Sequence, residues 1–413
     1  MSKLNIKTSL DLLEYDAPTG RMLVEGIPMT YHCNVFNHFF AKGVKLALGE
    51  EQGREVIYRA SEFAHYRLFR RLKEKYGLND RETYELGMDF FRSRGLGVLD
   101  IKSPDKIYLL ASTHAHTYIK VLRAFSDLPV CDVERGFVAG LLEAALDAEP
   151  GNIYVEESSC IGAGDPVCKL EVKIRRERVD YPEPDYGRVV FYEVEGADER
   201  RKTMEKLMPL IPEPDDSGII ALDSAFADIK KVWISQLPGE YYAYANMKVA
   251  EMADEEVARY SLVLAGFNCV FFTYVSIARS PIGEILLQDA VTEDDYFRKL
   301  AEMGNYFGFG VFKVGDIKRG GECLCNMRLY NFYENSYLLA LGREPLSYFL
   351  PGAALAQIMA TYRYRYYDRS TATLGAINAI FEDFDRAYET LNFDMEFDPT
   401  KNEQRVRLNV KGI

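Results

Sequence analysis

A hairpin that carries sulfur and carboxylate side chains at its tip constrains the fold of this chain more than any other sequence feature. Apolar and polar residues alternate over 152–156 and again over 169–175, which is the period-two pattern of β-strands. The segment between these runs is rich in glycine and carries Cys160 and Cys168. The sequence therefore predicts an antiparallel hairpin whose turn bears two thiols.

Four side chains in this region have the chemistry of a metal site: Cys131, Glu157, Cys160 and Cys168. Zinc binds thiolate sulfur and carboxylate oxygen in a tetrahedron, and four protein ligands leave no position open for water or substrate. Such a ligand set is therefore more typical of a structural zinc site than of a catalytic one. Two other interpretations stay open on the residues alone, namely unrelated buried cysteines or a disulfide, although the total of seven cysteines is odd. Strand alternation also leaves Glu156 as an alternative ligand.

The residues around the four ligands form three patterns: Pro129-Val130-Cys131, then Gly136-Phe137-Val138-Ala139-Gly140, then Glu157-x-x-Cys160 with Gly162-x-Gly164-Asp165-x-x-Cys168. Together they resemble the 4-vinyl-reductase domain. This family takes its name from bacteriochlorophyll biosynthesis and also forms the sensor domain of transcription activators that respond to phenol and xylene. In those sensors a Cys, a Glu and two further Cys bind zinc in this order, so the resemblance implies zinc at the four matching residues. The interval between the first Cys and the Glu is a few residues longer here.

The resemblance also implies an α+β domain, in which helices pack on an antiparallel sheet and an enclosed apolar cavity lies beside the zinc-binding hairpin. Such a domain captures a small hydrophobic molecule, and the 28 Tyr and 24 Phe of this chain can line a cavity. Four side chains near the strand-to-helix transition before Cys131 are predicted to bind the ligand: Tyr108, His114, His116 and Tyr118. Two alternatives stay open for the histidines: partly exposed residues at a helix start, or a second metal site.

The second half of the chain repeats features of the first at an interval of 216 residues. Pro129 is matched by Pro345 and Gly136 by Gly352, whereas Cys131 is matched by Ser347. Because proline and glycine determine turns, this register favours a duplication. The predicted organisation is two tandem 4-vinyl-reductase-like domains: a zinc-containing domain at 1–180, and a degenerate copy without zinc at 181–413 that includes an additional mixed segment at about 189–252.

Two further predictions concern the second half. A helix is predicted over 373–391, and the last segment, 394–413, is predicted to be an edge strand or a loose tail. The two copies are expected to pack as an internal pseudo-dimer, because family members resembling the first copy form homodimers. Homodimerisation of the whole chain stays open.

The composition limits the classes of partner. With 48% apolar residues and a net charge of −13, the chain is a folded globular protein that lacks the basic surface nucleic-acid binding requires. Segment 1–13 lacks the apolar core of a signal peptide, and the most apolar stretch, 260–277, includes Asn268. We therefore predict a buried helix or a helix–strand pair there, no membrane partner and a cytoplasmic location.

The predicted function is a binding or sensor protein for a small hydrophobic, aromatic-type compound, with a structural zinc ion. Those transcriptional sensors carry a phosphate-binding loop and a DNA-binding tail, and this sequence contains neither, so its output would pass through an unidentified protein partner. One alternative is an enzyme or accessory component of tetrapyrrole vinyl reduction or aromatic-compound metabolism. Another is a structural adaptor. No donor site for electrons or groups is evident, which favours binding over catalysis.

Overall fold

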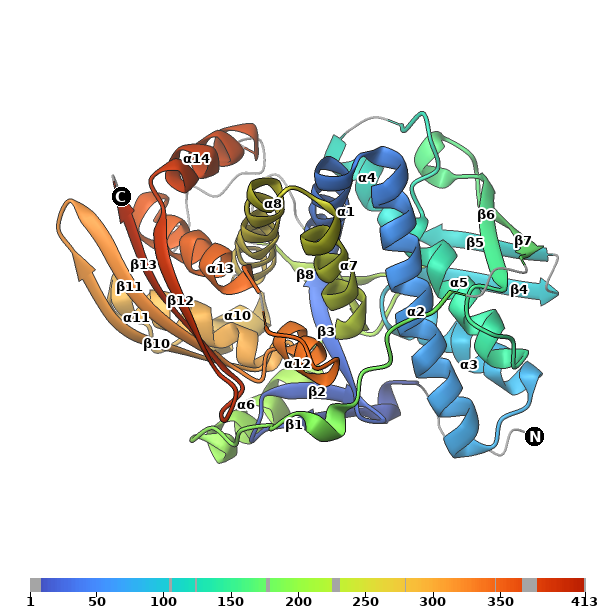
Figure 1. The fold of residues 1–413 in the computed structure, drawn as a ribbon, viewed down its shortest axis with the longest axis horizontal. Helices are drawn as coiled ribbons and strands as arrows, with labels where there is room; N and C mark the ends of the chain where they lie inside the picture. The colour runs from blue at the N-terminus through green and yellow to red at the C-terminus, as the bar shows by residue number, and fades with distance from the viewer. Residues whose placement is uncertain are drawn as a thin grey trace.

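The computed structural model describes residues 9–103, 106–122, 125–175, 179–224, 231–278, 280–345, 347–365 and 377–411. The described chain is an α+β fold with antiparallel sheets, as the sequence predicts. Figure 1 shows two four-stranded sheets at opposite ends of the molecule, with long helices between them.

Apart from short 3₁₀ turns, the elements up to residue 175 are β1 (Leu13–Asp16), β2 (Arg21–Val24), β3 (Ile27–Cys33), α1 (Asn34–Leu48), α2 (Glu50–Tyr76), α3 (Asp80–Ser93), β4 (Gly97–Ser103), β5 (Lys106–Ser112), α4 (Thr113–Leu122), α5 (Asp132–Ala145), β6 (Ile153–Ser159) and β7 (Cys168–Ile174). The later elements are α6 (Ala197–Leu207), β8 (Ile220–Asp223), β9 (Lys231–Pro238), α7 (Gly239–Met252), α8 (Glu255–Asn268), the π-helix η5 (Cys269–Tyr274), α9 (Val275–Ile277), α10 (Pro281–Leu287), α11 (Glu293–Glu302), β10 (Val311–Arg319), β11 (Glu322–Tyr330), α12 (Tyr333–Ala340), α13 (Phe349–Ile358), the π-helix η7 (Met359–Arg363), α14 (Ile377–Glu389), β12 (Asn392–Asp398) and β13 (Glu403–Lys411).

The two outer sheets have the same strand order. One sheet runs β4-β5-β7-β6 and the other runs β10-β11-β13-β12, so in each the last strand in sequence lies inside the sheet. All neighbours in both sheets are antiparallel. The hairpin predicted around the thiols is β6–β7, and β5 continues the same sheet.

A third sheet joins the two halves of the chain. Its order is β1-β2-β3-β9-β8, and β3 pairs with β9 so that Met29 lies opposite Pro238 and Cys33 lies opposite Ile234. Cys33 is the last residue of β3 before α1, and Pro238 is the last residue of β9 before α7. Strands from both sides of residue 180 therefore share one sheet.

The close crossing of α5 with α2 places the start of α5 next to the hairpin β6–β7. A Cβ atom on Gly136 would lie 2.2 Å from the carbonyl oxygen of Tyr58, so only glycine allows α5 to approach α2 this closely. In the second half a Cβ atom on Gly352 would lie 1.9 Å from the carbonyl oxygen of Val263, at the crossing of α13 and α8. The matched glycines thus occupy corresponding helix crossings.

The C-terminal segment corrects one prediction. The residues from 392 to 411 form the hairpin β12–β13. β12 is an edge strand, which agrees with one of the two alternatives, but β13 lies inside the sheet between β11 and β12 and is neither an edge strand nor a loose tail. Val406, Leu408 and Val410 alternate along β13 with more exposed residues and are buried, and this apolar row holds the strand inside the sheet. The helix predicted over 373–391 is present as α14, and its residues before 377 lie outside the described ranges.

The apolar stretch near residue 270 is an interior helix. Within the described residues, one helical run, Glu255–Ile277, is long and apolar enough to cross a membrane, but 89% of its most apolar window is buried inside the fold. The run comprises α8, η5 and α9, so of the two alternatives for 260–277 the buried helix is confirmed. Segment 189–252 contains α6, β8, β9 and α7.

Candidate metal centre and adjoining cleft

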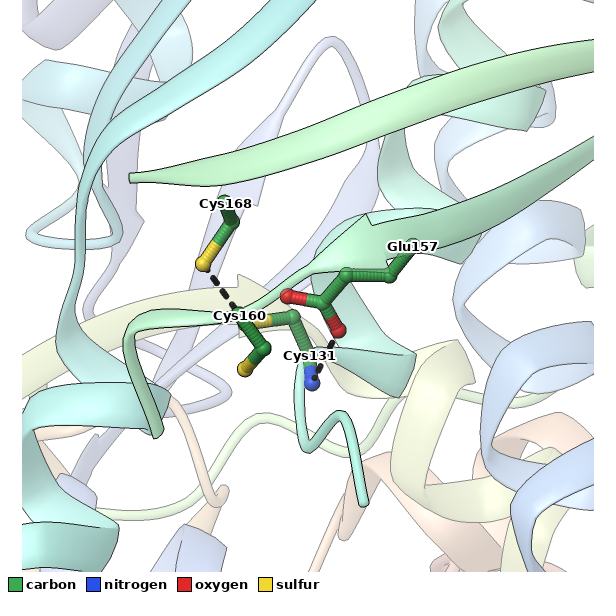
Figure 2. Close-up of side chains that lie close together, drawn as sticks. All are labelled: Cys131, Glu157, Cys160 and Cys168. Atoms are coloured by element: carbon green, nitrogen blue, oxygen red, sulfur yellow. Dashed lines mark hydrogen bonds between the residues drawn. The ribbon is translucent and has the colours of Figure 1, made fainter. Parts of the chain in front are cut away.

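The four predicted metal ligands come together from two strands, a turn and a helix start. Cys131 directly precedes α5, Glu157 lies on β6, and Cys160 and Cys168 lie on either side of the hairpin turn. Their side chains point toward one another in Figure 2, and one potential ligand atom from each lies within 4.8 Å of all the others. We refer to these four residues as the cysteine–glutamate cluster.

An irregularity in β6 decides which glutamate joins the cluster. Glu157 lies opposite Leu170, but the next paired residue, Ser159, lies opposite Lys169, so the strand contains a bulge. The extra residue reverses the side-chain alternation and places Glu157 on the side of the thiols. Glu156 is partly exposed and forms an ion pair with Lys173. The alternative ligand suggested by strand alternation is therefore wrong.

The dimensions of the cluster fit a tetrahedral thiolate site. The Sγ atoms of Cys131 and Cys168 are 3.6 Å apart. In a tetrahedron with metal–sulfur bonds of about 2.3 Å, neighbouring sulfur atoms lie about 3.8 Å apart. All seven cysteines are free thiols and buried, which excludes a disulfide. The described part of the second half contains no comparable group, and there the Ser347 hydroxyl donates to Glu334 at 2.8 Å.

The environment of the cluster calls for a cation. Oε2 of Glu157 accepts a hydrogen bond of 3.2 Å from the backbone N–H of Cys131, whereas Oε1 is buried without a partner. Burial raises the pKa of the Cys131 thiol, and burial with the nearby Cys160 raises the pKa of Glu157 to about 8, whereas hydrogen bonds from Cys131 and Cys168 lower the pKa of Cys160. Ionising more than this one thiol is costly here unless a positive charge compensates the added charges, and a metal ion would supply that charge.

A cleft of about 630 Å³ lies beside the cluster. One wall is α1, which contributes His38, Lys42 and Lys45. A second wall is the segment 126–133, in which every residue except Cys131 lines the cleft. The third wall is α4, which contributes His114 and Tyr118. The cleft is partly open to solvent, which differs from the enclosed cavity that the resemblance implies.

The two histidines of the cleft each have an unpartnered ring nitrogen. Nδ1 of His114 lies 2.8 Å from Oε1 of Glu134, and Nε2 of His114 is buried without a partner. Nε2 of His38 is likewise buried without a partner, and its ring lies edge-on to Tyr118 with centroids 5.5 Å apart. Burial, aided by Lys42 and the other nearby cationic groups, lowers the pKa of His38 to about 4, so this ring is neutral near pH 7.

The other two predicted ligand-binding residues lie elsewhere. His116 directs Nδ1 to the backbone carbonyl oxygen of Ser112, at 2.6 Å, and does not line the cleft. Tyr108 lies within β5, opposite Asp100 on one side and Lys169 on the other, and does not line it either. A metal site shared by His114 and His116 is also absent from the described residues, because the two rings bond different partners.

Sequence reasoning missed the contribution of α1. His38, Lys42 and Lys45 are spaced by four and three residues, which places them on one face of a helix. That spacing was visible in the sequence, but nothing in it shows which later segment the face approaches.

Comparisons with known proteins leave the family open. No family model matches this chain, and no curated protein matches it either. Among solved structures, the chain is similar to the crystal structure of the phenol-responsive sensory domain of the transcription activator PoxR with phenol. The TM-score is 0.35 at 18% sequence identity, and the match covers 40% of this chain and 86% of that chain. A likeness at this level transfers neither a ligand nor an activity.

Proposed function

We propose that this protein binds a small aromatic compound with a hydroxyl group in the cleft, and acts as a sensor or carrier for it. The supporting observation is the His114 ring, whose Nε2 atom is buried without a partner in a cleft of about 630 Å³. That volume falls within the range of small-molecule sites. Because Nδ1 of His114 faces the Glu134 carboxyl, Nε2 is free to accept a hydrogen bond from a ligand hydroxyl.

Apolar contact supplies most of the affinity in this proposal. Ile57, Leu128 and Val133 line the cleft together with the Tyr118 ring. Removing the apolar surface of a ring from water contributes ~25 cal/mol per Å². One hydroxyl bonded to His114 then orients the ring rather than dominating the affinity.

We further propose that the metal of the cysteine–glutamate cluster is zinc and that its role is structural. Three thiolates and one carboxylate suit zinc, and the four protein ligands complete a tetrahedron without an open position. Bound there, the ion holds the hairpin turn against the segment before α5, which is a wall of the cleft.

The metal assignment is tested by native mass spectrometry of the purified protein. We expect one zinc ion per chain, lost in Cys160→Ala. Cys323→Ala is the matched control, because Cys323 is equally buried but lies on β11, away from the cluster. Equal metal content in both variants would contradict the assignment.

The ligand site is tested by calorimetric titration with phenol. We expect His114→Ala to weaken phenol binding at least tenfold while the thermal unfolding temperature stays close to that of the parent protein. His116→Ala is the control, because this residue is on the same helix but outside the cleft. Equal loss in both variants, or no loss in either, would refute the site.

A duplication accounts best for the fold, and we propose that the halves are diverged copies of one domain paired as an internal pseudo-dimer. Three observations support this: the equal strand order of the outer sheets, the matched crossings at Gly136 and Gly352, and the pairing of β3 with β9. In that pairing each strand contributes its end next to a helix, as a two-fold related pair does.

A further inference from the structure

A chain of buried polar contacts connects the cysteine–glutamate cluster to the cleft. The Sγ atom of Cys131 lies 3.5 Å from the hydroxyl oxygen of Ser112. The Ser112 hydroxyl donates to Oε1 of Glu134 at 2.7 Å. The same oxygen lies 2.8 Å from Nδ1 of His114, whose other nitrogen is unpartnered at the cleft. Three contacts thus separate the metal ligand from the ligand-binding nitrogen.

Every member of this chain is removed from solvent. Cys131, Ser112 and Glu134 are 0% exposed and His114 is 9% exposed. Hydrogen bonds are strong and directional in such surroundings, because water does not compete for the donors and acceptors. Oε2 of Glu134 is buried without a partner, so the contacts of this carboxylate are concentrated on Oε1.

Glu134 determines which nitrogen of His114 faces the ligand. An imidazole that donates its Nδ1 hydrogen to a carboxylate keeps Nε2 as a bare acceptor. Without Glu134 both tautomers of the His114 imidazole become available. The tautomer that carries its hydrogen on Nε2 cannot accept a hydrogen bond from a ligand hydroxyl at that atom. Ser112 in turn holds Glu134, and its hydroxyl also accepts the backbone N–H of Ala115 in the first turn of α4.

On this basis, and resting on the proposed phenol-type site, we propose that Ser112 and Glu134 are positioning residues that couple the cleft to the metal centre. The main chain provides a parallel connection, because Cys131 lies between the cleft-lining residues Val130 and Asp132. Metal at the cluster would fix the position of Cys131, and Cys131 positions both the cleft wall and the Ser112 hydroxyl that it contacts. Ligand binding and metal binding then strengthen each other by the same factor.

The positioning role is tested with two probes of similar size, phenol and anisole, of which only phenol has a hydroxyl hydrogen. We expect Glu134→Ala to weaken phenol binding at least tenfold and anisole binding less than twofold. Glu134→Gln should restore most of the phenol affinity, because its amide oxygen accepts the Nδ1 hydrogen. Equal weakening for both probes would show a merely structural role and overturn the proposal.

The coupling is tested on the parent chain by measuring phenol affinity with and without zinc, and zinc affinity with and without phenol. The two ratios should agree and exceed three. In Glu134→Ala the ratio should fall but stay above one, because the main-chain connection through Cys131 remains. A ratio of one in the parent chain, with the metal-free protein still folded by circular dichroism, would overturn the coupling.

A ligand-free measurement separates this proposal from the proposed function. Imidazole ¹⁵N resonances report the tautomer of each of the five histidines. We expect His114 to carry its hydrogen on Nδ1 in the zinc-loaded protein and to change its signals in Ser112→Ala and on metal removal, with the His65 signals unchanged. If no aromatic probe binds but these shifts occur, the phenol site fails and the coupling stands. Unchanged His114 signals would overturn the coupling.

Discussion

Glu334 illustrates how burial alone changes the chemistry of a single residue. It lies in the first turn of α12, fully buried, and accepts a hydrogen bond of 2.8 Å from Ser347, the residue that the repeat matches to Cys131. Burial raises the pKa of Glu334 to about 7. At this position the second half has a hydroxyl where the first half has a thiol, and the partner of this hydroxyl is a carboxyl group that ionises near neutral pH.

This raised pKa predicts a pH dependence of stability. The folded state binds the Glu334 proton more tightly than the unfolded state, so the free energy of unfolding falls as the pH rises from about 4.5 through about 7. Up to about 3 kcal/mol is lost across that window. In Glu334→Gln this contribution disappears, which urea unfolding at pH 5 and pH 8 would measure. A parallel pH profile in the two proteins would contradict the assignment.

The pair Glu62 and Glu143 gives a second prediction at the residue scale. Both side chains are fully buried, and Oε1 of Glu143 accepts the backbone N–H groups of Gly151 and Ile153 at 2.7 Å and 3.0 Å. Burial and the nearby Glu62 raise the pKa of Glu143 to about 9, so it is protonated at neutral pH.

A neutral amide should therefore replace the Glu143 carboxyl group with little loss of stability. We expect Glu143→Gln to change the free energy of unfolding at pH 7 by less than about 1 kcal/mol, and Glu143→Ala to cost about 2–4 kcal/mol, because two buried N–H groups lose their acceptor. Denaturant titration of both variants distinguishes them. Similar losses in the two would show that Glu143 is ionised.

At the scale of elements, the crossing of α2 and α5 depends on one missing methyl group. A Cβ atom on Gly136 would lie 2.2 Å from the Tyr58 carbonyl oxygen and 2.7 Å from the Ser61 Cβ atom. Backbone atoms of a long helix cannot move aside locally. We expect Gly136→Ala to cost about 3 kcal/mol of stability, and to weaken metal binding, since α5 carries Cys131 at its start.

Gly43 provides the control for this prediction. It lies inside α1, and a Cβ atom there would have no neighbour within 4 Å. Gly43→Ala should raise stability by about 0.5–1 kcal/mol because alanine loses less backbone entropy in a helix. Thermal unfolding of the two variants should therefore shift in opposite directions.

The hairpin β6–β7 shows where prediction from local pattern ends. The alternation of apolar residues identified both strands, and the glycine-rich turn identified their connection. The same alternation left Glu156 as an alternative ligand, because a bulge cannot be recognised from the spacing of apolar and polar residues. The pairing of β6 with β7 places the bulge between Glu157 and Ser159.

At the scale of the whole molecule, the two halves share their interior. Buried residues from both sides of residue 180 belong to one continuous hydrophobic core, and α1 packs against α8 while α2 packs against α7. The five-stranded antiparallel sheet adds hydrogen bonds between β3 and β9. The halves therefore stabilise each other, whatever their origin.

The proposed duplication predicts how a fragment behaves. Without β9, the fragment 1–180 exposes β3, and a second copy of β3 can pair there in the two-fold arrangement that β9 now provides. We expect this fragment to be a homodimer by light scattering. His32→Pro should abolish dimerisation, because Tyr31 and Cys33 donate their N–H groups away from β9 and the His32 N–H therefore lies on the pairing side. A folded monomer would contradict the pseudo-dimer.

The sequence by itself determined the features whose information is local. Two alternating runs around a glycine-rich turn specify the hairpin, because side-chain periodicity reflects the nearest backbone geometry. The cysteines at its tip indicate a group that could hold a metal ion. Matched glycines and prolines were enough to predict a repeat. The interior helix at 260–277 was equally visible from its apolar composition.

Only the tertiary structure decided how these parts meet. His38 and His114 are far apart in sequence and face one cleft because α1 packs against α4. Ser112 and Glu134 were not singled out, since a serine at a strand end and a glutamate in a helix are ordinary until their hydrogen bond is formed. Such contacts depend on which faces the folded core brings together, and that choice is made by the packing of the whole chain.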